Sequence, residues 1–248
     1  MERIKIGVEM ELKNLRIFLL QLFVVLFLLP FSYLFIMLLA GNGGNLERIQ
    51  IVSLLTGYIV VTLTSAFINM LSLRITNTRQ PQVLELYSTF SITFPQIVVS
   101  QCITYTLLTL PLILAAFLYV ILSLKSVNIL LFISGIVIGI FVLLLLSVSL
   151  GLLMNNLFLA NGLYQIVSVF LIIFSPSFFD MQTVNKFFQT LLLLNPITHV
   201  LNILRSPLNI SLGFDVRWSY LFLFVLSVLL VLFASKKVSK TYILEKIF

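Results

Sequence analysis

Charged residues are scarce in this chain. Of its 248 residues, 60% are hydrophobic and only 9% are charged, and the mean hydropathy is +1.18. Because a soluble domain has about 25% charged residues, this composition excludes a soluble globular protein and indicates one membrane domain. The length leaves no room for a soluble catalytic domain as well, so extensive chemistry is expected from another chain.

Cysteine and histidine each occur once. Cys102 cannot form an internal disulfide, and no cluster of metal-ligating residues is present. A metalloprotease inside a membrane needs paired histidines with a carboxylate, whereas His199 is the single histidine of the sequence. We therefore interpret His199 as a structural hydrogen-bonding residue and do not expect an enzyme or a metal site.

Ionisable residues are missing from the long apolar runs. Six such runs are predicted to be transmembrane helices, which gives an all-α integral membrane fold. They cover about residues 17–39, 50–73, 95–124, 128–153, 162–179 and 218–235. Ion-coupled carriers and voltage sensors need ionisable groups within their spans, so both classes are disfavoured.

The basic residues lie scattered in short loops, although the net charge is +7. They do not gather on one face, so nucleic acid is not an expected partner. Six spans put both termini on one side; with that side in the cytosol, ten basic residues lie inside and five outside. The positive-inside rule therefore predicts a multi-pass protein of the plasma membrane with both termini cytosolic. The first run lacks a cleavage pattern and is interpreted as a retained span, followed by a turn at 41–45.

Residues 1–16 have the pattern of an amphipathic helix. Ile4, Val8, Leu12 and Leu15 form one apolar stripe, with most charged residues off it. Such a helix is predicted to lie in the membrane interface in contact with lipid. The alternative is a frayed tail that orders only through its neighbours.

Residues 78–90, between the second and third runs, predict a short cytosolic helix that starts at Pro81. Val83, Tyr87 and Phe90 share one face, and Glu85 lies on the opposite side. The apolar face could dock into a groove on a partner protein. It could also lie on the lipid surface, or the segment could be a compact turn.

Residues 181–210 predict a re-entrant helical hairpin in the outer leaflet. Two short apolar segments are separated by Asn195-Pro196, and Ser206-Pro207 ends the second.

Within the spans, polar side chains either pack helices together or line a substrate path. The candidates for the path are Asn69, Gln101 and Thr104. The spacings Gly135-x-x-x-Gly139 and Ser147-x-x-x-Gly151 predict close helix packing.

The order of these features resembles the ABC-2 type permease family, the membrane subunits of type V ABC transporters. The segment from Arg74 to Gln101 is similar to the family segment that carries a Leu-Glu pair on a cytosolic helix, and Glu85 matches that Glu. The segment from Asn195 to Leu208 is similar to a Pro-hydrophobic-Thr…Arg signature. Its matching residues are Pro196, Thr198 and Arg205. The sequence departs from the family pattern at Gln80-Pro81-Gln82, where a glycine usually precedes the Leu-Glu pair.

The resemblance implies a dimer of two permease copies, identical or different, each bound to an ABC ATP-binding subunit. That subunit would hold ATP and Mg²⁺, since this chain has no G-x-x-x-x-G-K-[ST] motif and no cofactor of its own is expected. The segment 78–90 would be the coupling helix. The residues assigned to it are Arg79, Val83, Leu84, Glu85, Tyr87 and Phe90.

The predicted function is a permease subunit of an ATP-driven exporter. The uncharged spans favour a hydrophobic or amphipathic substrate, such as a drug, a lipid or an antimicrobial or toxin peptide, taken from the cytosol or inner leaflet. A polysaccharide or glycolipid export permease and a non-transporting membrane scaffold are the alternatives.

Overall fold

The computed structural model describes residues 2–16, 19–28, 30–32, 35, 48–90, 92–124 and 127–245. Over these residues the chain is helical and contains no strand. The elements are α1 (Glu2–Leu15), α2 (Leu19–Phe23), η2 (Val24–Leu28), α4 (Arg48–Thr64), η4 (Ser65–Leu71), α5 (Ser72–Thr78), α6 (Pro81–Ser88), α7 (Phe94–Ser123), α8 (Ile129–Leu153), α9 (Leu157–Ile173), η5 (Met181–Thr183), α10 (Lys186–Leu193), α11 (Pro196–Arg205), η6 (Ser206–Leu208) and α12 (Val216–Glu245).

Four helices of the described part are long and apolar enough to cross a membrane. They are Arg48–Thr78, which joins α4, η4 and α5, then Phe94–Ser123, Ile129–Leu153 and Val216–Val238. A fifth crossing results if the bent pair of α10 with α11–η6 counts as one span. The all-helical, multi-pass architecture is therefore confirmed. Six spans stay a prediction, since residues 17–39 are described only in part and the predicted fifth span contains the helix Leu157–Ile173, which has 17 residues and is not among the four candidate spans. The turn at 41–45 lies outside the described residues.

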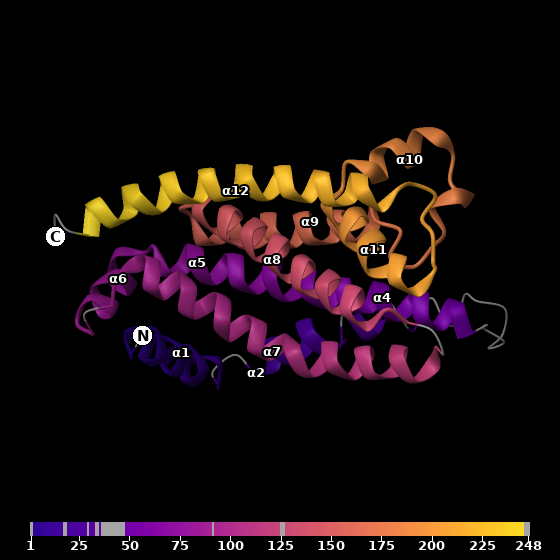
Figure 1. Cartoon of the computed structure of the whole chain (residues 1–248). Helices are drawn as coiled ribbons and strands as arrows, with labels where there is room; N and C mark the ends of the chain where they lie inside the picture. Colours follow the sequence, from indigo (N-terminus) through magenta and orange to yellow (C-terminus); the bar gives the residue numbers. More distant parts are fainter. Residues whose placement is uncertain are drawn as a thin grey trace.

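The two ends of the molecule differ in what they carry (Figure 1). Helices α1 and α6 lie at the same end as the last turns of α12. The short helices α10 and α11 lie at the opposite end. The axis of α11 turns by 90° from that of α10, at the predicted break before Pro196. The expected broken hairpin is therefore present, and it is far from α6.

Two predicted span boundaries were wrong. The run 162–179 corresponds to α9, which begins five residues earlier because the Asn156 side chain accepts hydrogen bonds from the first backbone N–H groups of the helix. α9 ends at Ile173, and the residues that follow form a turn. The second span was expected to end at residue 73, but the helix continues to Thr78 and carries Arg74.

Helix α11 is buried along its whole length, between α4, α8 and α12. Two glycines of α8 make this approach possible. A Cβ atom at Gly139 would lie 2.8 Å from Val200 Cγ1, and one at Gly135 would lie 3.2 Å from Ile203 Cγ2. The predicted role of this glycine pair in helix packing is confirmed.

The substitution Gly151→Ala is expected to destabilise the protein. A Cβ atom there would lie 2.7 Å from Ile75 Cβ and 2.8 Å from the Ser72 carbonyl oxygen, so α8 and α5 would have to separate. Overpacking of this kind costs about 1–3 kcal/mol. The melting temperature of the purified protein should fall by several degrees. Gly162→Ala is the matched control, because nothing lies within 4 Å of that position, and an equal melting temperature for both variants would contradict the prediction.

Candidate functional site

The candidate functional site lies where α1, α5, α6 and α7 meet. α1 turns Gly7, Glu11 and Leu15 toward the protein, each four residues from the next. Gly7 lies against Ser100 of α7, whose hydroxyl donates to the carbonyl oxygen of Ile4 over 3.1 Å. This close approach brings the Glu11 side chain, which is only 1% exposed, into the interior. The buried face of α1 therefore differs from the predicted apolar stripe: of that stripe only Leu15 is buried, Leu12 is exposed, and the acid Glu11 lies inside.

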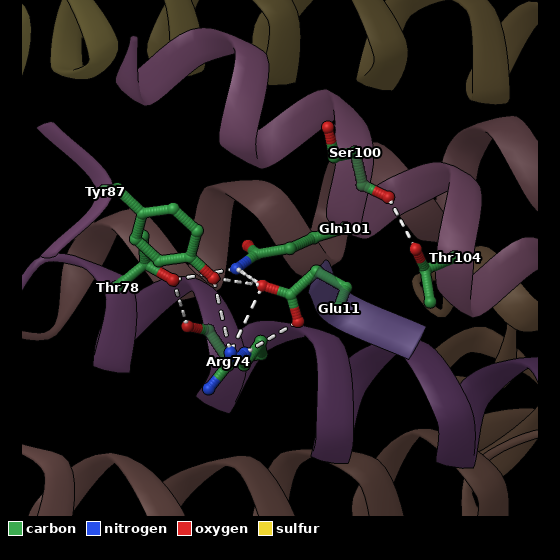
Figure 2. Close-up of polar contacts among 7 residues, drawn as sticks. All are labelled: Glu11, Arg74, Thr78, Tyr87, Ser100, Gln101 and Thr104. Atoms are coloured by element: carbon green, nitrogen blue, oxygen red, sulfur yellow. Dashed lines mark hydrogen bonds and ion pairs between the residues drawn. The ribbon is translucent and has the colours of Figure 1, made fainter. Parts of the chain in front are cut away.

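Three elements donate hydrogen bonds to the Glu11 carboxylate (Figure 2). From α5, Arg74 donates through Nε to Oε2 over 2.9 Å and through Nη2 to Oε1 over 3.2 Å. From α6, the Tyr87 hydroxyl donates to Oε1 over 2.6 Å, and from α7, Gln101 Nε2 donates to the same oxygen over 3.1 Å. Because both charged groups are paired and bonded, their burial is tolerated. We call Glu11, Arg74, Tyr87, Gln101 and Thr78 the Glu11 cluster.

The remaining polar contacts of the cluster fix its geometry. Gln101 Nε2 also donates to Thr78 Oγ1 over 2.7 Å, and that hydroxyl donates to the Arg74 carbonyl oxygen over 2.9 Å. Burial, and next the negative charge of Glu11, raise the pKa of the Tyr87 phenol well above its usual range. Tyr87 therefore keeps its proton at any physiological pH and remains a donor to Glu11. Gln101 Oε1 is buried without a hydrogen-bond partner.

The three predicted path residues are interior groups. Gln101 and Thr104 are fully buried, and Thr104 Oγ1 donates to the Ser100 carbonyl oxygen of its own helix over 2.9 Å (Figure 2). Asn69 lies in the π-helix η4, and its Oδ1 is buried without a hydrogen-bond partner. Gln101 thus joins α7 to α1 and α5, whereas the hydroxyl of Thr104 bonds within α7. The role of the three residues in a substrate path stays a prediction.

The structure also corrects the predicted docking face of α6. Tyr87 is only 2% exposed, and Val83 packs beside it against the protein, so both belong to the inner face. Leu84 is half-buried against the main core. Of the predicted docking face only Phe90 is exposed. The exposed residues of α6 and of the two positions after it are Pro81, Gln82, Glu85, Leu86, Thr89 and Phe90. Any partner would meet this second set, and the role of α6 in coupling stays a prediction.

The turn before α6 binds the end of α8. Arg79 Nη1 donates to the carbonyl oxygens of Leu152 over 2.8 Å and of Met154 over 3.1 Å. Gln80 Nε2 donates to the Asn155 carbonyl oxygen over 3.0 Å. Arg79 thus caps the last turn of α8, where a positive charge is favourable. Since it precedes α6 and is half-buried, its predicted place on the docking helix was wrong.

At the opposite end, the predicted hairpin signature is a packing site. Pro196 is the first residue of α11, and the preceding Asn195 caps the helix by accepting from the Ile197 N–H over 3.0 Å. The guanidinium of Arg205 donates four hydrogen bonds to residues of α4 and of the turn after α9. Thr198 Oγ1 is buried without a hydrogen-bond partner.

A cavity of about 480 Å³ lies beside the Glu11 cluster and reaches the start of α9. Its lining residues are Leu15, Met70, Leu73, Arg74, Asn77, Tyr105, Leu157, Phe158 and Asn161. We call it the Arg74 cavity. Its volume lies in the range of pockets that bind small molecules. Among the described residues, no group of His, Cys, Asp or Glu is arranged to hold a metal ion.

The sequence reasoning missed Glu11, Asn77 and Tyr105. Glu11 was detectable in principle, because it lies four residues from both Gly7 and Leu15 and so shares their face of the helix. Asn77 and Tyr105 carried no local signal, since the cavity that they line forms only when α5, α7 and α9 come together.

Comparison with protein families and with curated proteins gives one match. A family model described as ABC-2 type transporter matches residues 21–209, which is more than half of the chain. No curated protein matches the sequence. The matched region contains α6, the Arg74 cavity except Leu15, and the hairpin with Arg205. The ABC-2 membrane domain is a permease and not an ATPase. The chain therefore belongs to the ABC-2 type transporter family, as a multi-pass membrane permease.

Proposed function

We propose that this permease is the membrane subunit of an ATP-driven exporter that moves a hydrophobic or amphipathic substrate out of the cytosol or inner leaflet. ABC-2 permeases generally pair with an ATP-binding subunit. In this proposal α6 is the coupling helix that meets that subunit, and a second permease copy completes the pathway. The end that carries α1 and α6 is then cytosolic, in agreement with the distribution of basic residues.

This proposal rests on the two faces of α6, of which one is apolar and exposed and the other is hydrogen-bonded to the interior of the protein. Leu86 and Phe90 are 57% and 49% exposed, so an apolar surface faces outward. On the inner side, Tyr87 donates to Glu11 and accepts a hydrogen bond of 3.4 Å from Arg74 Nη2. Arg74 belongs to the helix that runs without a break from Arg48 to Thr78. A force on α6 therefore reaches both α1 and the second span through buried, charge-assisted contacts.

Export then follows from a change in affinity between two states. An ATP-driven movement of α6 would shift the second span, and with it the wall of the Arg74 cavity. Substrate leaves outward only if the outward-facing state binds it more weakly than the inward-facing state. The hairpin of α10 and the buried α11 lies at the opposite end, where release would occur.

The substitution Leu86→Asp is expected to prevent the permease from recruiting its ATPase. Leu86 points away from the protein, so the fold should be unaffected, but a charge would be buried where an apolar side chain docks. We expect at least a tenfold loss of ATPase recovered with the tagged permease from its host membrane, because a buried unpaired charge costs several kcal/mol. Leu86→Met is the conservative control and should retain the partner.

The same preparation separates the exporter from a membrane scaffold. An exporter should yield a stoichiometric nucleotide-binding partner and vanadate-sensitive ATP hydrolysis. Recovery of the wild-type chain alone, with no ATPase after crosslinking in the membrane, would overturn the proposed function. Normal recruitment by Leu86→Asp would instead overturn only the assignment of α6.

A further inference from the structure

The Arg74 cavity has one polar wall and one apolar wall. Arg74 and Asn77 of α5, Tyr105 of α7 and Asn161 of α9 supply the polar groups. The apolar wall includes Leu157 and Phe158, and Phe158 is 87% exposed at the rim. A molecule in this cavity therefore meets hydrogen-bonding groups on one side and can extend an apolar tail past α9 into the surrounding lipid.

The polar wall has donors that the protein itself does not use. Arg74 binds Glu11 through Nε and Nη2, while Nη1 makes no hydrogen bond to any described residue. Figure 2 shows this nitrogen turned away from Glu11 and its other partners. The Tyr105 hydroxyl and the Asn77 amide also make no side-chain hydrogen bond within the described part, although Tyr105 is only 4% exposed. Donors that face a cavity and have no partner among the described residues can bind the acceptor atoms of a ligand.

The charge of the site selects among ligands. Glu11 is the nearest carboxylate, and its oxygens already accept from Arg74, Tyr87 and Gln101. A cationic head group would thus find no free carboxylate and would face the guanidinium. A head group with acceptor oxygens could accept hydrogen bonds from Arg74 Nη1, and the Tyr105 hydroxyl could donate to the same oxygens.

We propose that the Arg74 cavity binds an amphipath whose head group is a carboxylate or a phosphodiester and whose tail is apolar. This inference rests on the proposed function, because it names the class of cargo that the exporter would take up. A single negative charge fits best, since Glu11 lies directly behind Arg74 and repels a second one. Both head groups are delocalised anions with paired oxygens. A carboxylate would identify the ligand as a free fatty acid, and a phosphodiester would identify it as a membrane lipid.

Three amphipaths with the same twelve-carbon tail test this inference. Radiolabelled laurate, lauroyl lysophosphatidylglycerol and dodecyltrimethylammonium are each titrated onto the permease in nanodiscs of phosphatidylcholine, together with its ATPase where one is recovered. At least one of the two anions should bind about tenfold or more tightly than the cation. Preference for laurate identifies a free carboxylate as the ligand, and preference for the lysolipid identifies a membrane lipid.

The variant Tyr105→Phe removes one donor without changing the packing. It should weaken binding of the anion about three- to tenfold, the loss expected for one hydrogen bond. Tyr119→Phe, on the same helix but exposed and outside the cavity lining, should bind as the wild type does. Equal binding of cation and anions, or unchanged binding by Tyr105→Phe, overturns the inference and leaves an ATP-hydrolysing complex intact. Charge-selective binding by a chain that recruits no ATPase supports the site and overturns the proposed function.

Discussion

The substitution Arg205→Met should prevent the chain from accumulating in the membrane in a folded form. The Arg205 side chain is only 2% exposed, and all its hydrogen bonds go to oxygen atoms of the protein. Nε donates to Thr56 Oγ1 over 3.0 Å, and Nη1 donates to the Pro176 carbonyl oxygen over 2.8 Å. Nη2 donates to the carbonyl oxygens of Ser53 over 3.1 Å and Ser177 over 2.9 Å.

Methionine fills a similar volume but donates nothing, so the carbonyl groups of Pro176 and Ser177 lose their donor, whereas that of Ser53 keeps the Thr56 hydroxyl. Each buried polar group left without a partner costs about 1–3 kcal/mol, and the loss of both reaches the lower end of the stability of a typical domain, about 5–15 kcal/mol. The hairpin would separate from α4 and from the turn after α9. A lysine at this position could donate to only some of the oxygen atoms that Arg205 binds, so Arg205→Lys should accumulate to an intermediate level.

Fluorescence-detected size exclusion of a tagged chain measures this effect directly. Arg217→Met is the matched control, because Arg217 is exposed at the start of α12 in the same half of the molecule. It should give a wild-type monodisperse peak, whereas Arg205→Met should give aggregate or no signal. A wild-type peak from Arg205→Met would show that the four hydrogen bonds contribute little to the fold.

The hairpin was predictable from the sequence because its signals are local. Asn195 caps α11 through the nearby Ile197 N–H, and Pro196 takes the first helical position, where its missing N–H has no effect. The end of α9 was not predictable in this way. The apolar run continues to residue 179, but the chain turns after Ile173 and the carbonyl oxygen of Ser177 binds Arg205, 28 residues further along. Hydropathy cannot distinguish a helix from a turn that a distant side chain satisfies.

Local sequence patterns also could not predict which way the apolar face of α6 points in the candidate site. The spacing of Val83 and Tyr87 correctly placed them on one face of a helix, as both pack inward beside Met10. Which way that face points depends on Glu11, whose partner Tyr87 lies 76 residues away in the sequence. An apolar face with one hydroxyl can dock outward on another protein or inward on a buried acid, and the local pattern is the same in both cases.

The second large effect is expected from Glu11→Leu. This variant leaves the guanidinium of Arg74 in the interior without its carboxylate, and breaking a buried pair in this way costs about 3–5 kcal/mol. Tyr87 and Gln101 would lose their acceptor at the same time. The melting temperature should fall strongly, whereas Glu9→Gln, at an exposed position of the same helix, should leave it unchanged.

The double variant Glu11→Leu with Arg74→Met separates the contribution of the Glu11 cluster to stability from its contribution to coupling. Replacing both charged partners by apolar side chains removes the unpaired charge, so part of the lost stability should return, although the Tyr87 hydroxyl stays without its acceptor. The link from Tyr87 of α6 to α1 and α5 would still be absent. In the purified complex, ATP hydrolysis should therefore continue without stimulation by substrate at any concentration, and transport should be lost. Tyr105→Phe, which weakens only binding in the Arg74 cavity, should instead keep the stimulation at higher substrate concentration. If the double variant transports as the wild type does, the cluster only holds α1 in place, and the force from α6 must reach the spans through the contacts of Arg79 and Gln80 with the end of α8.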